Sequence, residues 1–161
     1  MVTSLLDLLI NCAGVDVHPR AWAENDSSTL MTKFRVMAVG PFLATKAFLP
    51  NLERSSSPKV INISSDFASV SENDRGRCIG YRMAKTALNQ QTVTIANELK
   101  AAGSNVIMIA VDPGDVPTRL SRGNGKTDID KSVRGIVEII ESANLVDSGS
   151  FLKWTGGKIP F

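Results

Sequence analysis

Cysteine, histidine and long apolar runs are all scarce in this sequence, and each scarcity excludes a class of protein. The two cysteines, Cys12 and Cys78, are too few for a disulfide scaffold, and we interpret them as reduced thiols of a cytoplasmic protein. The single histidine, His18, argues against a histidine-based metal site and against a Ser-His-Asp triad. No apolar run reaches the ~18 residues that span a bilayer, so we expect no membrane segment and no signal peptide.

An excess of charge of one sign is also lacking. The 161 residues contain 18 Lys and Arg against 16 Asp and Glu, and the basic residues are scattered, which argues against a nucleic-acid partner. Hydrophobic residues make up 43% of the chain, enough to bury a substantial core and to exclude disorder. We therefore expect one ordinary domain over residues 1–161.

Short apolar runs alternate with longer amphipathic segments along the chain. Four runs have strand character: residues 5–11, 59–63, 106–111 and 150–154. Three segments have helical spacing: about 28–49, about 81–102 and the region around 136–140. Ser27 or Ser28 is the expected cap of the first helix. The alternation predicts the α/β class, with helices flanking a mainly parallel sheet.

Ser65, Tyr81 and Lys85 carry the most informative chemistry. Tyr81 and Lys85 are four residues apart in a predicted helix, so their side chains share a face. Taken alone, this spacing also fits an ordinary exposed helix pair. A neighbouring ammonium favours phenolate, so we expect the pKa of Tyr81 to fall from about 10 toward neutrality and activity to weaken in acid. Such a tyrosine can exchange a proton with a carbonyl oxygen, which Ser65 can hold from the end of a predicted strand.

Four motifs occur in an order that resembles the short-chain dehydrogenase/reductase family. They are Leu9-Ile10-Asn11-Cys12-Ala13-Gly14-Val15, Val60-Ile61-Asn62-Ile63-Ser64-Ser65, Tyr81-Arg82-Met83-Ala84-Lys85 and Asp112-Pro113-Gly114-Asp115-Val116-Pro117-Thr118. Residues 149–161 resemble the closing strand and tail of the branch that includes the sniffer-type carbonyl reductases and the C-factor proteins. The resemblance implies a truncated, Rossmann-like three-layer fold that contains the last four strands of the family's sheet.

The resemblance also implies a role for each matching residue. Tyr81 would be the general acid and base, Lys85 would lower its pKa and hold the nicotinamide ribose, and Ser65 would orient the substrate carbonyl. The residues implied to contact an NAD or NADP cofactor are Asn11, Ala13, Gly14, Pro113, Gly114 and Thr118. Met37 stands where the family usually has an asparagine, and Pro41 removes the N–H that would normally bond the Met37 carbonyl.

A Gly-rich phosphate loop is missing from the sequence. The family opens with such a loop, whereas no Gly-x-Gly-x-x-Gly occurs here, and residues 123–127 lack the spacing of a phosphate loop. The chain begins at what corresponds to the family's fourth strand, so we expect three βα units to be absent. The strand at 5–11 would then have an open edge. We expect a homodimer or higher oligomer, formed through this edge and the helices at 28–49 and 81–102.

Three functions follow as hypotheses. The first, ranked narrowly ahead, is a cofactor-independent enzyme that uses the Ser-Tyr-Lys set to isomerise, cyclise or dehydrate a small carbonyl compound. The second is an NAD(P)H-dependent carbonyl reductase completed by a partner or a missing segment. The third is a non-catalytic remnant or interaction module. We expect a small, apolar or aromatic substrate, with Phe42, Met83 and Trp154 as possible wall residues that also fit core positions.

Overall fold

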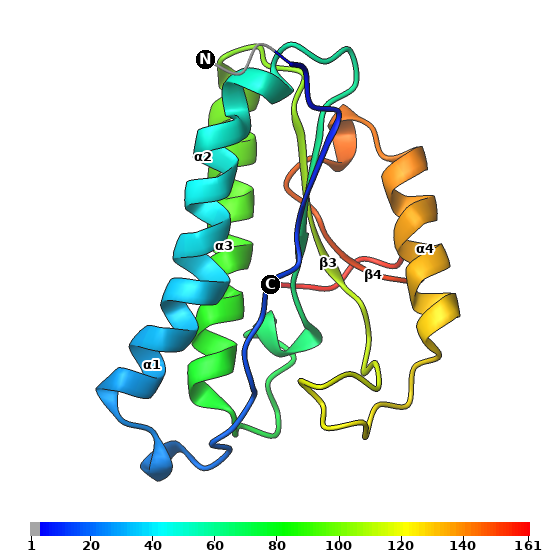
Figure 1. Ribbon diagram of the computed structural model, residues 1–161. Coiled ribbons are helices and arrows are strands. Elements are labelled where there is room, and N and C mark those ends of the chain that lie inside the picture. The colour runs from blue at the N-terminus through cyan, green and yellow to red at the C-terminus, as the bar shows by residue number, and fades with distance from the viewer. Residues whose placement is uncertain (1–3) are drawn as a thin grey trace.

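The computed structural model describes residues 4–161. Its sheet consists of four parallel strands. The strands are β1 (Leu8–Asn11), β2 (Lys59–Ile63), β3 (Ile107–Asp112) and β4 (Phe151–Lys153). They lie side by side in that order, and each neighbouring pair is parallel. Figure 1 shows the sheet between two layers of helices, so the predicted three-layer α/β fold is confirmed.

The helices are divided unequally between the two faces of the sheet. One face is covered by α1 (Ser27–Phe34), α2 (Gly40–Leu52) and α3 (Ile79–Ala101), and the other by α4 (Ile129–Ser142) (Figure 1). Three short 3-10 turns complete the elements: η1 (Trp22–Glu24), η3 (Asp66–Ala68) and η4 (Leu145–Asp147). Within residues 4–161, no helix combines the length and the apolar character that crossing a membrane requires.

The core forms where both faces of the central strands meet the helices. Val60 and Met108 are fully buried on the face that also holds Leu99 of α3. Ile61 and Ile109, their neighbours in the chain, point to the opposite face and pack with residues of α4. The pleat of the strands produces this alternation. Because both faces are covered, the two central strands are nearly continuous apolar runs.

Element boundaries shift by a few residues from the predicted ones. Asp26, not Ser27 or Ser28, caps α1, because its carboxylate accepts the N–H of Thr29 at 2.7 Å. The next long helix, α3, begins before residue 81 because a left-handed turn at Cys78 leads directly into it. The fourth helix extends well beyond 136–140 in both directions.

The first predicted helix, 28–49, is interrupted rather than continuous. Between α1 and α2 the chain makes a π-helical turn, η2 (Arg35–Val39), in which the Gly40 N–H donates to the Arg35 carbonyl. Pro41 has no N–H, so the Met37 carbonyl cannot form its normal helical bond, and the wider turn takes its place. Met37 itself is fully buried at this turn.

Within the described residues, β1 forms the edge of the sheet and pairs with β2 alone. Regular pairing begins at Leu8 rather than at residue 5, so the strand is shorter than predicted. Ile10 keeps 46% of its surface exposed. The edge is therefore open and partly apolar, which is the arrangement that favours contact with another chain.

Four polar side chains link β1 to the elements behind it. The Asn11 amide donates to Asn62 of β2 at 2.8 Å and to Thr45 of α2 at 3.3 Å. Asn62 donates in turn to the Thr92 hydroxyl of α3 at 2.8 Å. This amide ladder (Asn11, Thr45, Asn62 and Thr92) fixes the register of β1, because Asn11 has its partners only when it lies opposite Asn62.

Candidate active site

A cavity of about 680 Å³ opens at the carboxyl ends of the strands. This is the edge at which open parallel sheets bind their ligands, and the volume is typical of a small-molecule site. Ser65, Tyr81 and Lys85 all line the cavity, together with the Asp112-Pro113-Gly114 turn after β3. The structure thus brings the three predicted acid/base residues together.

Ser64 and Ser65 follow β2 and point in opposite directions. The Ser64 hydroxyl is buried and donates to the Asn89 side chain of α3 at 2.7 Å. Ser65 faces the cavity, where its hydroxyl donates to the Asp66 carboxylate at 3.1 Å and is close enough to Tyr81 to act on the pKa of that phenol. The alternation of the strand continues through the two serines, so Ser65 is the one that a substrate can reach.

Tyr81 lies in the first turn of α3, and its ring is largely buried. Only 6% of the residue is exposed. Met37 belongs to the same apolar cluster, and the ring of Phe67 meets the Tyr81 ring edge to face, with 6.1 Å between centroids. The ring is therefore held rigidly against apolar neighbours, while its hydroxyl reaches the cavity beside Ser65.

The expected lowering of the Tyr81 pKa is wrong. Burial raises the pKa of Tyr81 to about 12. The Ser65 hydroxyl opposes this change, whereas the carboxylates of Asp112 and Asp66 reinforce it. Tyr81 consequently remains protonated at neutral pH and is available there as an acid.

Lys85 lies one helical turn after Tyr81. Its Nζ donates to the carbonyl of Ile63, at the end of β2, at 2.6 Å and lies 5.7 Å from the centroid of the Tyr81 ring. The residue is 3% exposed, and burial lowers its pKa to about 8. Lys85 therefore still carries a positive charge at neutral pH, close to the Tyr81 ring.

The residues expected to contact a nicotinamide do not all reach the cavity. Asn11 and Ala13 are not among its lining residues, and Asn11 instead uses its amide in the amide ladder. Those that do line it are Gly14, Pro113, Gly114 and Thr118.

Gly114 forms a tight turn after β3. Its φ of +78° is a left-handed conformation that glycine adopts without strain. A Cβ at this position would lie 2.7 Å from Thr127 Oγ1 and 2.9 Å from Trp154 Nε1, so the turn packs too closely for a side chain. Trp154 thus supports the wall of the cavity from behind.

The three possible wall residues named from the sequence do not line the cavity. Trp154 lies behind the Gly114 turn, and Phe42 and Met83 lie on the helical surface, where 42% and 50% of each residue is exposed. The aromatic side chain that does line the cavity, besides Tyr81, is Phe67 of η3.

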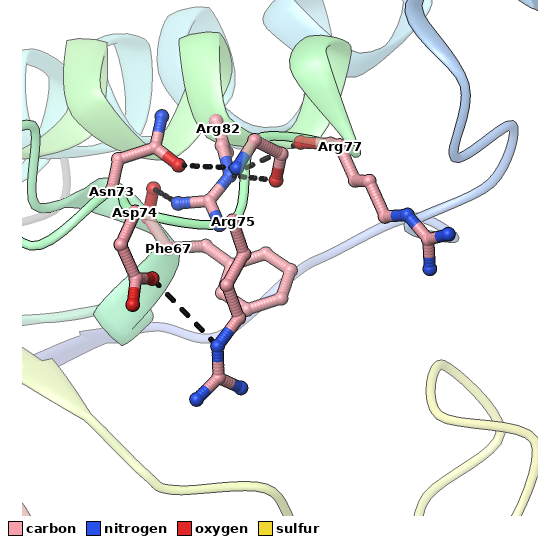
Figure 2. Close-up of polar contacts among 7 residues, drawn as sticks. Phe67, Asn73, Asp74, Arg75, Arg77 and Arg82 are labelled. Atoms are coloured by element: carbon pink, nitrogen blue, oxygen red, sulfur yellow. Dashed lines mark hydrogen bonds and ion pairs between the residues drawn. The ribbon is translucent and has the colours of Figure 1, made fainter.

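Several charged residues that line the cavity were not among the site residues predicted from the sequence. Asp112 is 3% exposed, accepts the Gly114 N–H at 3.1 Å, and has a pKa raised by burial. The loop before α3 and the start of the helix contribute Arg75, Arg77 and Arg82 (Figure 2). The sequence signal for this loop was the dense run of charges at 72–77, which also fits an ordinary polar loop.

Comparisons with known proteins agree on one family. The model of the short chain dehydrogenase family matches residues 2–128. C-signal of Myxococcus xanthus is 30% identical over 159 residues, which cover 99% of this chain and 95% of C-signal. Human retinol dehydrogenase 13 is 32% identical over 130 residues, which cover 74% of this chain and 38% of that protein.

Two solved carbonyl reductases have the same fold as this chain. The NADPH-bound carbonyl reductase from chicken fatty liver matches with a TM-score of 0.88 and 28% identity, over 99% of this chain. The carbonyl reductase Sniffer of D. melanogaster matches with a TM-score of 0.91 and 25% identity, over 98% of this chain. This chain spans 67% of the length of each structure. Since the family model matches most of its residues, this protein belongs to the short-chain dehydrogenase family.

Proposed function

We propose that this chain supplies the catalytic part of an NAD(P)H-dependent carbonyl reductase. The observation that carries the proposal is the single cavity in which Ser65, Tyr81 and Lys85 meet the Pro113-Gly114 turn. The two solved carbonyl reductases of matching fold support it, one of them with NADPH bound. The relatives favour this function over the cofactor-independent enzyme that the sequence alone ranked first.

The three side chains can carry out the proton-transfer half of a carbonyl reduction. A reduced nicotinamide, when bound, supplies the hydride for the carbonyl carbon. Tyr81 donates its phenolic proton to the carbonyl oxygen, and the Ser65 hydroxyl holds that oxygen in place. Lys85 stabilises the tyrosinate that remains until water returns the proton. The product is the corresponding alcohol.

The residues of this chain fit the nicotinamide end of the cofactor. Gly14, Pro113, Gly114 and Thr118 line the same cavity as Lys85. The sequence contains no Gly-rich loop that would bind the pyrophosphate at a helix N-terminus. In this proposal, the phosphates and the adenosine are therefore held by residues beyond this sequence, in a further segment or in a partner chain.

A cofactor titration combined with Tyr81→Phe tests the proposal. We expect saturable binding of NADPH or NADH by the folded chain, measured by nicotinamide fluorescence, and NADPH-dependent reduction of an aldehyde. Tyr81→Phe keeps the ring and its packing but removes the acid, so binding is retained and turnover falls by about 10²–10⁴-fold. Aldehyde conversion that proceeds equally with and without NADPH or NADH, or that is unchanged in Tyr81→Phe, would overturn the reductase function.

A cofactor-independent acid/base enzyme remains the second candidate, because the Ser-Tyr-Lys set is intact while the phosphate loop is missing from the sequence. This candidate predicts that the wild type converts a carbonyl compound in the absence of NADPH and that Tyr81→Phe does not. Equal function in the wild type and in Tyr81→Phe would instead indicate a non-catalytic interaction module.

A further inference from the structure

Several arginines surround the mouth of the cavity, and they come from two neighbouring segments. Five basic and three acidic side chains line the cavity. Arg75 and Arg77 belong to the loop between β2 and α3, and Arg20 belongs to the segment between β1 and α1. The Cys78 N–H donates to the Arg20 carbonyl at 2.7 Å, so the two segments are joined beside Arg77.

Arg82 is committed to holding the loop in place (Figure 2). Its Nε lies 3.1 Å from the carbonyl oxygens of both Gly76 and Arg77, and its Nη1 donates to the Phe67 carbonyl at 3.3 Å. The guanidinium lies over the Phe67 ring, 4.3 Å from the centroid. Asn73 Oδ1 also accepts the Gly76 N–H at 3.0 Å. The loop is therefore pre-formed by side-chain bonds to its own backbone.

The backbone of this loop is strained at Arg77. Gly76, Arg77 and Cys78 have φ values of +60°, +62° and +53° in succession. This conformation is unfavourable for arginine and cysteine, and such strain is retained most often at functional sites. Figure 2 shows the Arg77 side chain extending away from Asn73 and Asp74, clear of the bonds that Arg82 makes.

The guanidinium groups of Arg20 and Arg77 are available to a ligand. Within residues 4–161, neither of them forms a hydrogen bond or an ion pair. Arg75 pairs with Asp74 at 3.7 Å, but their side chains are 87% and 80% exposed, and such a pair contributes little stability.

In the part of the chain that the structure describes, residues 4–161, none of the three acidic side chains that line the cavity, Asp66, Asp112 and Asp115, forms an ion pair with Arg20 or Arg77. Asp66 accepts the Ser65 hydroxyl, and the buried Asp112 accepts the Gly114 N–H. Arg20 and Arg77 therefore place unpaired positive charge in the same cavity as the proposed acid, Tyr81.

We propose that Arg20 and Arg77 bind an acidic group of the substrate, so that this site acts on carbonyl compounds bearing a carboxylate or a phosphate. The inference rests on the proposed function, because it concerns the compound that reaches Tyr81. A guanidinium presents planar N–H donors that match the oxygens of either group. Phe67 supplies an apolar surface for the rest of the substrate, which agrees with the apolar or aromatic compound expected from the sequence.

Three benzaldehydes that differ only in the group opposite the aldehyde show whether the site prefers a carboxylate, a phosphate or an uncharged group. They are 4-formylbenzoate, 4-formylphenyl phosphate and the uncharged methyl 4-formylbenzoate. Calorimetric titration of the full chain is expected to give at least about tenfold tighter binding of one anion than of the ester, with a difference that shrinks as salt is raised. The tighter of the two anions identifies the acidic group.

Arg77→Asn and Arg122→Asn form a matched pair of variants. Both arginines have positive φ, of 62° and 55°, and asparagine tolerates this conformation better than most residues. Arg122 pairs with Asp16 at 3.2 Å and does not line the cavity. We expect Arg77→Asn, and likewise Arg20→Gln, to reduce the preference for the anion to threefold or less, and Arg122→Asn to preserve it.

Four results would count against the inference, and a fifth would separate it from the reductase function. Equal or tighter binding of the ester, no binding of any aldehyde, or a preference that survives in both Arg77→Asn and Arg20→Gln would overturn it. Loss of NADPH binding in Arg77→Asn, with the aldehyde preference unchanged, would assign the arginines to the cofactor instead. A preference for the anion without any NADPH-dependent turnover would support the arginine site while the reductase function fails.

Discussion

Ser64 and Ser65 are adjacent in the chain, but their hydroxyls have different neighbours. Ser64 bonds to Asn89, whose Nδ2 is buried and has no hydrogen-bond partner within the described residues. Ser65 faces the cavity next to Tyr81. A difference of one position therefore separates a residue that stabilises the fold from one that can touch a substrate.

Alanine at each of the two serines is expected to affect different properties. Ser64→Ala leaves Asn89 with both ends of its amide unpaired, so the free energy of unfolding should fall by about 1–3 kcal/mol. Ser65→Ala should reduce carbonyl turnover by about 10²-fold. It also removes the cap that the Ser65 hydroxyl provides to the Phe67 N–H at 3.2 Å, which should lower the free energy of unfolding by about 0.5–2 kcal/mol. Urea unfolding and initial rates measure the two effects. Normal turnover in Ser65→Ala would contradict the proposed position of the substrate oxygen.

The pH dependence of reduction is expected to follow Lys85. Its pKa of about 8 means that the charge near Tyr81 is lost as the pH rises through 8, while Tyr81, with a pKa of about 12, stays protonated. Reduction rates should be level from acid to neutral pH and decline above about pH 8. This is the opposite of the loss of activity at acidic pH that the sequence predicted. Lys85→Met should be slow and lack this decline. A wild-type rate that rises between pH 8 and 9 would exclude the assignment.

At the scale of elements, α4 approaches the segment after β4 so closely that Gly135 has no room for a side chain. A Cβ there would overlap the backbone carbonyl oxygen of Trp154. Gly135→Ala should therefore lower the free energy of unfolding by about 2–3 kcal/mol, although alanine favours helices. Gly40→Ala is the matched control, because its Cβ would lie 3.5 Å from the Arg35 carbonyl oxygen, an ordinary contact. Equal stability of the two variants would show that α4 can move away from the sheet.

The elements could be predicted from the sequence where local pattern specifies them. β2 matches its predicted range because its apolar, β-branched run is unambiguous, and the alignment of Tyr81 with Lys85 follows from their spacing in one helix. The pKa of Tyr81 could not be predicted, because its burial depends on Met37 and Phe67, which belong to other elements. No local signal brings Arg20 next to the loop of Arg77 either.

At the scale of the whole molecule, one helical face carries many exposed apolar side chains. Helices α1 to α3 lie together on one side of the sheet (Figure 1). Their apolar residues that remain at least 38% exposed include Met31, Phe34, Phe42, Leu43, Phe48 and Met83. We propose that this face, together with the open edge of β1, mediates the expected self-association.

Light scattering at micromolar concentration tests the self-association. The chain should be a dimer or larger, and Leu43→Glu should shift it toward the monomer, because a carboxylate would be buried in the contact. Val146→Glu is the control, since Val146 is 85% exposed but lies in η4, outside the three helices. A monomeric wild type, or equal dissociation of both variants, would contradict this role of the helical face.

The amide ladder also bears on the order of events during folding. Asn11 and Asn62 are 51 residues apart, so β1 docks through a contact that is entropically costly to close. A docking that slips by one residue would turn the Asn11 amide to the opposite face of the sheet, away from Thr45 and Asn62, so we expect it to be less stable than the native pairing. We therefore expect the ladder to select the native register during folding. That register is the one that places Cys12 and Gly14, which follow β1, at the cavity.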